Sequence, residues 1–280
     1  MSERTAIIID FDRTLFDADA FGSGLHDSVK TFGVTKKMWD RCYEEAGQDG
    51  IFRLGPFVEA LAAKTGRAPA DIRAAVDAET AEAIWYLHAD SRAFLETFST
   101  TARLFLVTLG CPELQRQKVA AVGLSQYFEE IIVVEQPKAE SGKLPVSAVE
   151  QAVFINDDLD ELLELAQVYR WAHHVHVNRA RTELPPRFPF RSFPDLRSAT
   201  PYVASIVGPV AEPAESVDTQ PRREAADPVA AVALERELRA VLALLDDLLA
   251  CAVADDGEPC ALFEGDRVEV ATGRQVRRGG

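Results

Sequence analysis

Cysteine is scarce in this sequence, and the cysteines that occur form no metal or disulfide pattern. Cys42, Cys111, Cys251 and Cys260 lie far apart, with no C-x-x-C pair and no cysteine–histidine cluster that has the spacing of zinc ligands. This gives no support to a structural zinc site and disfavours a disulfide-stapled secreted domain. We expect reduced, mostly buried thiols in a protein of the cytoplasm.

Long hydrophobic runs and an excess of basic residues are also missing. The apolar run near the N-terminus is too short for a signal-peptide core or a membrane span, and no other segment reaches spanning length. With 30 Lys and Arg against 45 Asp and Glu, the formal net charge is −15. Such a chain has no general attraction for nucleic-acid phosphates or anionic lipids. We therefore expect a soluble protein that binds neither membranes nor nucleic acids.

Short apolar runs alternate with helical patterns over much of the chain. The run AIII at 6–9 is compact and β-branched, as in a strand that is buried on both faces. Later strand candidates are LFLVT at 104–108, EIIVV at 130–134, VFIN at 153–156 and the segment 174–177. Helical patterns lie between them at 91–98, 112–122 and 160–169. This alternation predicts an α/β fold, a Rossmann-like parallel sheet covered by helices on both faces.

Residues 21–87 show helical periodicity and no strand pattern. Thr35 is a candidate N-cap, and large aliphatic residues recur at helical spacing between 68 and 87. We predict a helical cap that is inserted between two core segments, 1–20 and 88–200.

The composition changes again after about residue 200. Residues 201–227 are predicted to be a linker, since most of this stretch is rich in Pro, Ala and acidic residues. Within 228–280 a Leu and Val heptad pattern predicts an amphipathic helix, and a small hairpin follows. Two alternatives stay open for this helix. It either packs on its own domain or binds a second copy or another protein through 228–252.

Two carboxylates, Asp10 and Asp12, directly follow the first predicted strand. Ligands of α/β folds bind beyond the carboxyl ends of the strands. Paired carboxylates there are costly unless a cation offsets their charge, and Mg²⁺ prefers hard oxygen ligands. A turn that begins at Phe11 would let the two side chains diverge, one toward a metal ion and the other toward a leaving group.

The segment IIIDFDRTLFD that contains these carboxylates resembles the first signature of the haloacid dehalogenase (HAD) superfamily of hydrolases. Thr108 at the end of LFLVT resembles the second signature, and a lysine after EIIVV resembles the third. Asp157-Asp158, just after VFIN, resembles the fourth. The similarity covers residues 5–197, and each motif lies at the end of a predicted parallel strand.

The resemblance implies a role for each motif. Asp10 is expected to attack phosphorus and form an aspartyl-phosphate, and Asp12 to protonate the leaving oxygen and then activate water. Thr108 is expected to hydrogen-bond a phosphoryl oxygen, while the lysine neutralises negative charge. The expected Mg²⁺ ligands are Asp10, the backbone carbonyl of Asp12, and Asp157.

Two assignments within these motifs leave alternatives. Lys138 closely follows the third strand and leaves room for a helix, so we favour it over Lys143, which stands just before Pro145. The fourth motif carries a further acid in the family, for which Asp158, Asp160 and Glu161 all qualify. Asp158 is in addition a candidate metal ligand. Three late histidines are expected to lie on an edge strand or the surface: His173, His174 and His176.

The acid at Asp12 separates two chemistries within the superfamily. Members that cleave carbon–halogen bonds resemble this chain at the nucleophile but lack an acid two residues later. We therefore predict a Mg²⁺-dependent phosphohydrolase whose partner is a small phosphorylated metabolite held under the cap. A phosphomutase on the same core is an alternative, and so is a non-catalytic binding module that acts through its C-terminal helix.

Overall fold

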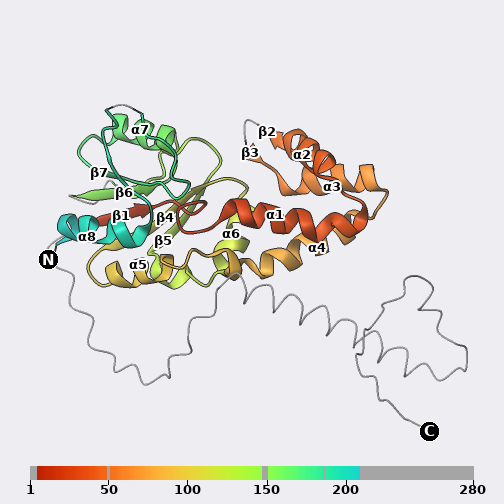
Figure 1. Cartoon of the computed structure of the whole chain (residues 1–280), viewed down its shortest axis with the longest axis horizontal. Coiled ribbons are helices and arrows are strands. Elements are labelled where there is room, and N and C mark those ends of the chain that lie inside the picture. The colour runs from red at the N-terminus through yellow and green to blue at the C-terminus, as the bar shows by residue number, and fades with distance from the viewer. Residues whose placement is uncertain (1–4, 49–50, 147–150, 186, 209–280) are drawn as a thin grey trace, which may run out of the picture. The chain divides into compact units, whose positions relative to one another are not determined.

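The computed structural model describes residues 5–48, 51–146, 151–185 and 187–208 (Figure 1). The predictions for the C-terminal helix and hairpin in 228–280, and for most of the linker, lie outside these residues, as do Cys251 and Cys260. Cys42 and Cys111 are buried and free, as expected. Among the described residues, no helix combines the length and hydropathy that crossing a bilayer requires.

A six-stranded parallel sheet forms the centre of the core, in the order β5-β4-β1-β6-β7-β8. Its strands are β1 (Ala6–Ile9), β4 (Arg103–Leu109), β5 (Glu130–Val134), β6 (Ala152–Asn156), β7 (His173–Val177) and β8 (Arg191–Phe193). Strand β1 pairs with β4 on one side and β6 on the other, so that Ile8 lies between Phe105 and Phe154. The predicted α/β fold is confirmed.

Helices cover both faces of this sheet (Figure 1). The core helices are α5 (Ser91–Phe98), α6 (Pro112–Ala121), α7 (Leu159–Val168) and α8 (Leu196–Val207). Ile7 and Ile9 point into the hydrophobic cluster that α5, α6 and α8 complete, whereas Ile8 points into the cluster completed by α7. Successive side chains on a strand alternate between faces, so β1 has no polar position.

The segment between β1 and α5 lies to one side of the sheet (Figure 1). It contains α1 (Ala18–Val29), η1 (Lys30–Phe32), α2 (Lys36–Glu45), β2 (Gly47–Gln48), β3 (Ile51–Phe52), α3 (Leu54–Thr65), α4 (Pro69–Ala81) and η2 (Ala83–Tyr86). Thr35 caps α2 by accepting a hydrogen bond from the amide of Met38 at 3.3 Å. The β2–β3 pair was not expected, because two residues per strand are too few to produce an alternating pattern.

The C-terminal border of the core differs from the prediction. Residue 201, where the linker was expected to begin, lies inside α8, which continues to Val207. Pro201 removes one helical amide donor, but the acceptor it would have bonded belongs to exposed Arg197, where water can replace it. Leu196, Ala199 and Val203 are fully buried on the opposite face of the helix. This packing outweighs the helix-breaking tendency of proline.

The prediction for the late histidines was wrong for two of them. Strand β8 covers the outer side of β7, so β7 is not an edge strand. His174 is buried and stacks on Phe154, with ring centroids 5.4 Å apart. His176 is 1% exposed. A three-residue strand among prolines gives no sequence signal, and therefore the burial of its neighbour could not be foreseen.

Candidate active site

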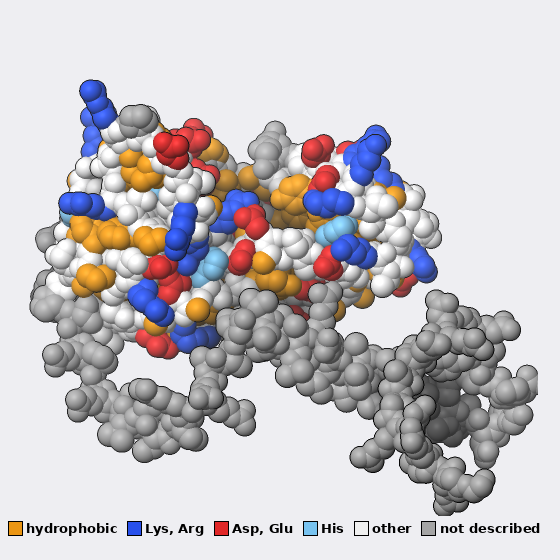
Figure 2. Space-filling view, in the orientation of Figure 1, with side chains coloured by type: hydrophobic (Ala, Val, Ile, Leu, Met, Phe, Trp, Pro, Cys, Tyr) orange, Lys and Arg blue, Asp and Glu red, His pale blue; other side chains and the backbone are white. Residues whose placement is uncertain are grey.

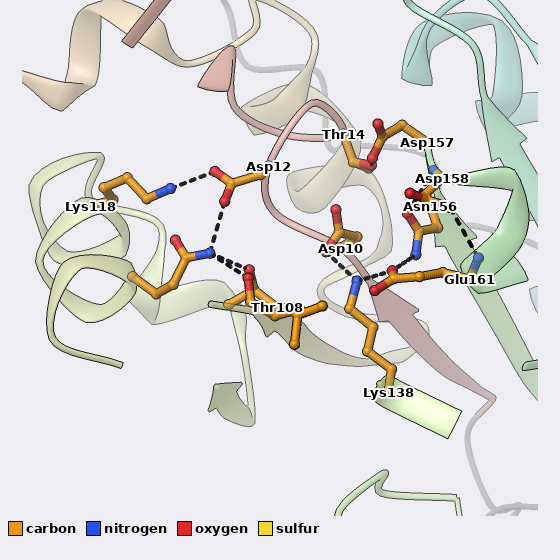
Figure 3. Close-up of polar contacts among 12 residues, drawn as sticks. Asp10, Asp12, Thr14, Thr108, Lys118, Lys138, Asn156, Asp157, Asp158 and Glu161 are labelled. Carbon is orange, nitrogen blue, oxygen red and sulfur yellow. Dashed lines mark hydrogen bonds and ion pairs between the residues drawn. The ribbon is translucent and has the colours of Figure 1, made fainter. Parts of the chain in front are cut away.

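Strands β1, β4, β5 and β6 bring the four motifs together at one edge of the sheet (Figure 3). Asp10 follows β1, Thr108 lies near the end of β4, and Asp157 follows β6. Lys138 begins η4 (Lys138–Glu140), just beyond β5. Parallel strands all end at the same edge, which is why residues up to 147 positions apart in the sequence, Asp10 and Asp157, become neighbours.

The favoured lysine contacts the predicted nucleophile. The Nζ atom of Lys138 donates to Oδ1 of Asp10 at 2.5 Å and to Oε2 of Glu161 at 2.7 Å, and the residue is only 4% exposed. Burial disfavours its charge, but the two carboxylates outweigh burial and raise the pKa of Lys138 above its ordinary value. Lys143, the alternative, is exposed.

The acidic groups of the fourth motif have separate tasks. Asp158 accepts hydrogen bonds from the amides of Asp160 and Glu161 at 2.9 and 3.0 Å, so its carboxylate serves as the N-cap of α7. Glu161 instead contacts Lys138 and accepts from Nδ2 of Asn156 at 2.6 Å. Of the three candidates for the further acid, Glu161 is therefore the one that contacts Lys138.

The surroundings of Asp10 and Asp157 disfavour the charged form of each carboxyl group. Burial raises the pKa of Asp10 to about 7; the charge of Lys138 opposes this and that of Asp157 adds to it. Burial likewise raises the pKa of Asp157 to about 6, against the charges of Arg13 and Lys138. Both carboxyl groups thus lack sufficient positive charge, and a divalent cation would supply it.

The donor set fits Mg²⁺ only if backbone oxygen takes part. In the described part of the chain, no group of three or more His, Cys, Asp or Glu residues is arranged to hold a metal ion. Asp10 and Asp157 remain as carboxylate ligands, and the expected third ligand is the backbone carbonyl of Asp12. Two carboxylates with a backbone oxygen and water are donors that Mg²⁺ accepts readily.

The side chain of Asp12 turns toward α6, away from Lys138 (Figure 3). Its Oδ2 accepts from Nε2 of Gln115 at 2.8 Å, and its Oδ1 lies 2.5 Å from Nζ of Lys118. The same Gln115 nitrogen donates to Oγ1 of Thr108 at 2.8 Å. Asp10 and Asp12 thus face different partners, as a turn at Phe11 was expected to allow.

Gln115 and Lys118 were missed by the sequence analysis. Lys118 is 4% exposed and its ammonium lies 5.1–5.6 Å from the ring centroids of Phe11, Phe16 and Phe21. Aromatic faces attract a cation and so compensate part of the cost of burying it. The only signal in the sequence was their spacing of three, which places both residues on one face of α6.

Two side chains, the half-buried Arg179 and the buried His176, hold the loops that carry the motifs. Arg179 donates to the carbonyl of Thr14 through Nε and Nη2, at 2.9 and 2.7 Å, and Nη2 also contacts Asp90 at 2.9 Å. The Nε2 atom of His176 lies 3.0 Å from the carbonyl of Asp157, and its Nδ1 lies 2.8 Å from Oγ of Ser192. These contacts fix the backbone at Thr14, in the loop that follows Asp12, and at Asp157.

A cavity of about 740 Å³ lies between the core and the cap. Asp12, Arg13 and Lys118 line its core side. Its cap side is lined by five aromatic side chains: Phe21, Trp39, Tyr43, Phe52 and Phe57. In Figure 2, hydrophobic side chains and charged side chains of both signs lie together where the core meets the cap. The volume is in the range of small-molecule sites, and the cavity reaches the predicted acid Asp12.

The contacts of the two candidate lysines predict opposite results for matched variants. Lys138→Met leaves Asp10 and Glu161 without their cation and removes charge stabilisation at the nucleophile. We expect turnover to fall roughly 100- to 1,000-fold. Lys143→Met should keep wild-type turnover, because this side chain is exposed. Initial rates of both variants, after circular dichroism has confirmed folding, test the assignment. Equal losses in the two would contradict it.

The raised pKa of Asp10 predicts a pH-dependent stability in EDTA. A carboxyl group whose folded-state pKa lies above its ordinary value stabilises the fold while protonated, and this stability is lost as pH rises to about 7. Asp10→Asn imitates the protonated acid. Relative to wild type, we expect the unfolding free energy of the variant to increase by about 3 kcal/mol between pH 5 and pH 8. Urea denaturation at both pH values measures this, and parallel curves would refute it.

The comparison with solved structures identifies the fold. No protein-family model and no curated protein sequence matches the chain. Among solved structures, a HAD-like hydrolase of Burkholderia xenovorans LB400 matches with a TM-score of 0.58 at 15% identity, over 74% of this chain and 100% of that one. YfnB of Bacillus subtilis, described as a HAD-hydrolase bound to magnesium, gives 0.53 at 16%, over 74% and 99%. A 2-haloacid dehalogenase of Pseudomonas syringae pv. tomato DC3000 gives 0.52 at 17%, over 72% and 98%.

These similarities define the class to which the fold belongs. The chain has the fold of the HAD-like hydrolases, as its four sequence motifs predicted. The neighbours include a protein described as a dehalogenase, so the fold alone does not select the reaction. That choice rests on the side chains of the site.

Proposed function

We propose that the chain is a Mg²⁺-dependent phosphohydrolase that acts on a small organic phosphate monoester through an aspartyl-phosphate intermediate. The observation that carries the proposal is Asp12, an acid two residues after the nucleophile whose side chain lines the cavity under the cap. Cleavage of a phosphate ester requires proton transfer to the leaving oxygen. Hydrolysis of a haloalkanoate has no such requirement, because halide leaves as an anion.

The reaction divides into two half-reactions on these residues. A carboxylate oxygen of Asp10 bonds to phosphorus while the bond from phosphorus to the leaving oxygen breaks, and Asp12 gives its proton to that oxygen. Asp12, now a carboxylate, takes a proton from water as the water oxygen attacks phosphorus. The bond from phosphorus to the Asp10 oxygen breaks, inorganic phosphate leaves, and Asp10 is restored as a carboxylate. Thr108 and Lys138 are suited to hold the phosphoryl oxygens throughout.

Asp10, Asp157 and the carbonyl of Asp12 are the residues that would hold Mg²⁺, whose charge offsets that of the carboxylates and the phosphate. The description of YfnB as bound to magnesium supports this choice of ion. Lys118 has a different task, because its ammonium contacts Oδ1 of Asp12 and so orients that side chain. The cap above the site would exclude bulk water during transfer.

Hydrolysis assays test the proposal directly. p-Nitrophenyl phosphate and a panel of small phosphate monoesters are incubated with the protein in Mg²⁺ and in EDTA, and phosphate release is measured. We expect release that depends on Mg²⁺. The same preparation is offered 2-chloropropionate, and chloride is measured. Chloride release without any phosphate release would replace the proposal with dehalogenation.

A further inference from the structure

The aromatic wall of the cavity includes a flat surface. The rings of Tyr43 and Phe52 are stacked, with centroids 4.8 Å apart and an angle of 14° between their planes. Phe57, which is 1% exposed, supports Phe52 from behind with an edge contact at 5.2 Å. Tyr43 itself is 50% exposed, although a large aromatic side chain is ordinarily buried more deeply. The surface is therefore firmly held and partly uncovered.

This surface lies close to the residues that would act on the leaving group. Tyr43 and Asp12 line the same cavity. Burial raises the pKa of the Tyr43 phenol, and the charge of Asp12 raises it further while that of Arg13 lowers it. The phenol is thus close enough to the loop that contains Asp12 and Arg13 for their charges to act on it. A leaving group whose oxygen lies at Asp12 would share this cavity with the stacked rings.

We propose that the cavity binds a planar aromatic leaving group and that the substrates are nucleoside 5′-monophosphates. This inference rests on the proposed phosphohydrolase function. The phosphate would lie at Asp10, the ribose would pass Asp12, and the base would stack on Tyr43. A sugar without a base would leave the face of Tyr43 without a stacking partner. The edges of a base can instead reach the charged pair of Lys36 and Asp40, which also line the cavity.

Three substrates, two that carry a base and one that lacks it, test the inference. Initial rates with Mg²⁺ are compared for adenosine 5′-monophosphate, uridine 5′-monophosphate and ribose 5-phosphate. Stacking of a base on an aromatic side chain should favour the nucleotides in kcat/KM by about 10- to 100-fold. If ribose 5-phosphate is hydrolysed as efficiently as the nucleotides, the inference fails while the proposed function stands.

Variants locate the effect on the aromatic surface. Tyr43→Leu keeps apolar volume and removes the ring face, so the preference for nucleotide over ribose 5-phosphate should fall about tenfold, mainly through KM. Trp85→Leu is the matched control, because Trp85 is exposed and does not line the cavity. It should retain the wild-type preference. A loss in Tyr43→Leu that is equal for both substrates would overturn the inference, since it indicates general damage to the cap.

Binding gives a readout that does not depend on turnover. Calorimetry on Asp10→Asn compares adenosine 5′-monophosphate with ribose 5-phosphate in Mg²⁺. Tighter binding of the nucleotide, weakened by adding Tyr43→Leu, supports the aromatic site even if wild type proves inactive on every ester. In that case the proposed function fails and the binding site remains. Equal affinity for the two ligands would overturn the site itself.

Discussion

Asp10→Asn is expected to reduce the hydrolysis of phosphate monoesters by more than about 10⁴-fold, because an amide cannot form the aspartyl-phosphate. The substitution preserves shape and removes only the charge and one oxygen. Lys138 keeps its contact with Glu161, so the surrounding structure should survive. Phosphate release under saturating substrate measures the loss. Mass spectrometry of quenched wild-type enzyme should show phosphate on the peptide that contains Asp10.

Asp160→Asn is the control for this experiment. Asp160 is an exposed carboxylate in the first turn of α7, and its side chain has no part in the proposed chemistry. We expect its turnover to stay within about twofold of wild type, as is usual for surface substitutions. Retained activity in Asp10→Asn, or a phosphate found on another residue, would remove Asp10 from the role of nucleophile.

Asp12→Asn is expected to slow the two half-reactions to different extents, depending on the leaving group. Without an acid, esters of poorly leaving alcohols should react about 1,000-fold more slowly. p-Nitrophenolate leaves without protonation, so phosphorylation of Asp10 by p-nitrophenyl phosphate should be affected far less. Hydrolysis of the aspartyl-phosphate needs the base and should become rate-limiting. Stopped-flow absorbance should therefore show a burst of p-nitrophenolate that is stoichiometric with enzyme, followed by a slow steady state.

The leaving-group dependence discriminates between a chemical and a structural role for Asp12. If loss of the carboxylate only disturbed the contacts with Gln115 and Lys118, both kinds of ester would lose rate equally and no burst would be seen. Lys118→Met provides the comparison, since it disturbs the same contacts and leaves the acid in place. A burst in this variant as large as in Asp12→Asn would argue against Asp12 as the acid and base.

The parts of the fold that were predictable are those with a strong local cause. A strand buried on both faces must be apolar at every position, and AIII therefore gave β1 with the observed bounds. The apolar, β-branched run that follows Glu130 likewise gave β5. Asp10 and Asp157 stood out because carboxylates that directly follow such strands are costly without a cation. Candidate site residues could therefore be predicted from the sequence where they directly follow a strand.

The parts that were not predictable depend on contacts between distant segments. Lys118 looks like a solvated helix residue, and only the folded chain shows that three aromatic rings and Asp12 surround it. His176 resembled an edge-strand residue because β8 has no pattern of its own. The length of α8 was hidden for a similar reason: Pro201 is a local signal against helix, whereas burial of Leu196 and Val203 is a tertiary one.

The bonds from Arg179 to the carbonyl of Thr14 join residues 165 positions apart. Strand β1 likewise has no sheet partner until β4 and β6 are available on its two sides. On a ribosome the chain emerges from its N-terminus, so the loop that bears Asp10 leaves long before the residues that secure it. Closing such long loops makes assembly slow. Asp10, although synthesised before the residues that secure its loop, would be among the last groups to reach its working position.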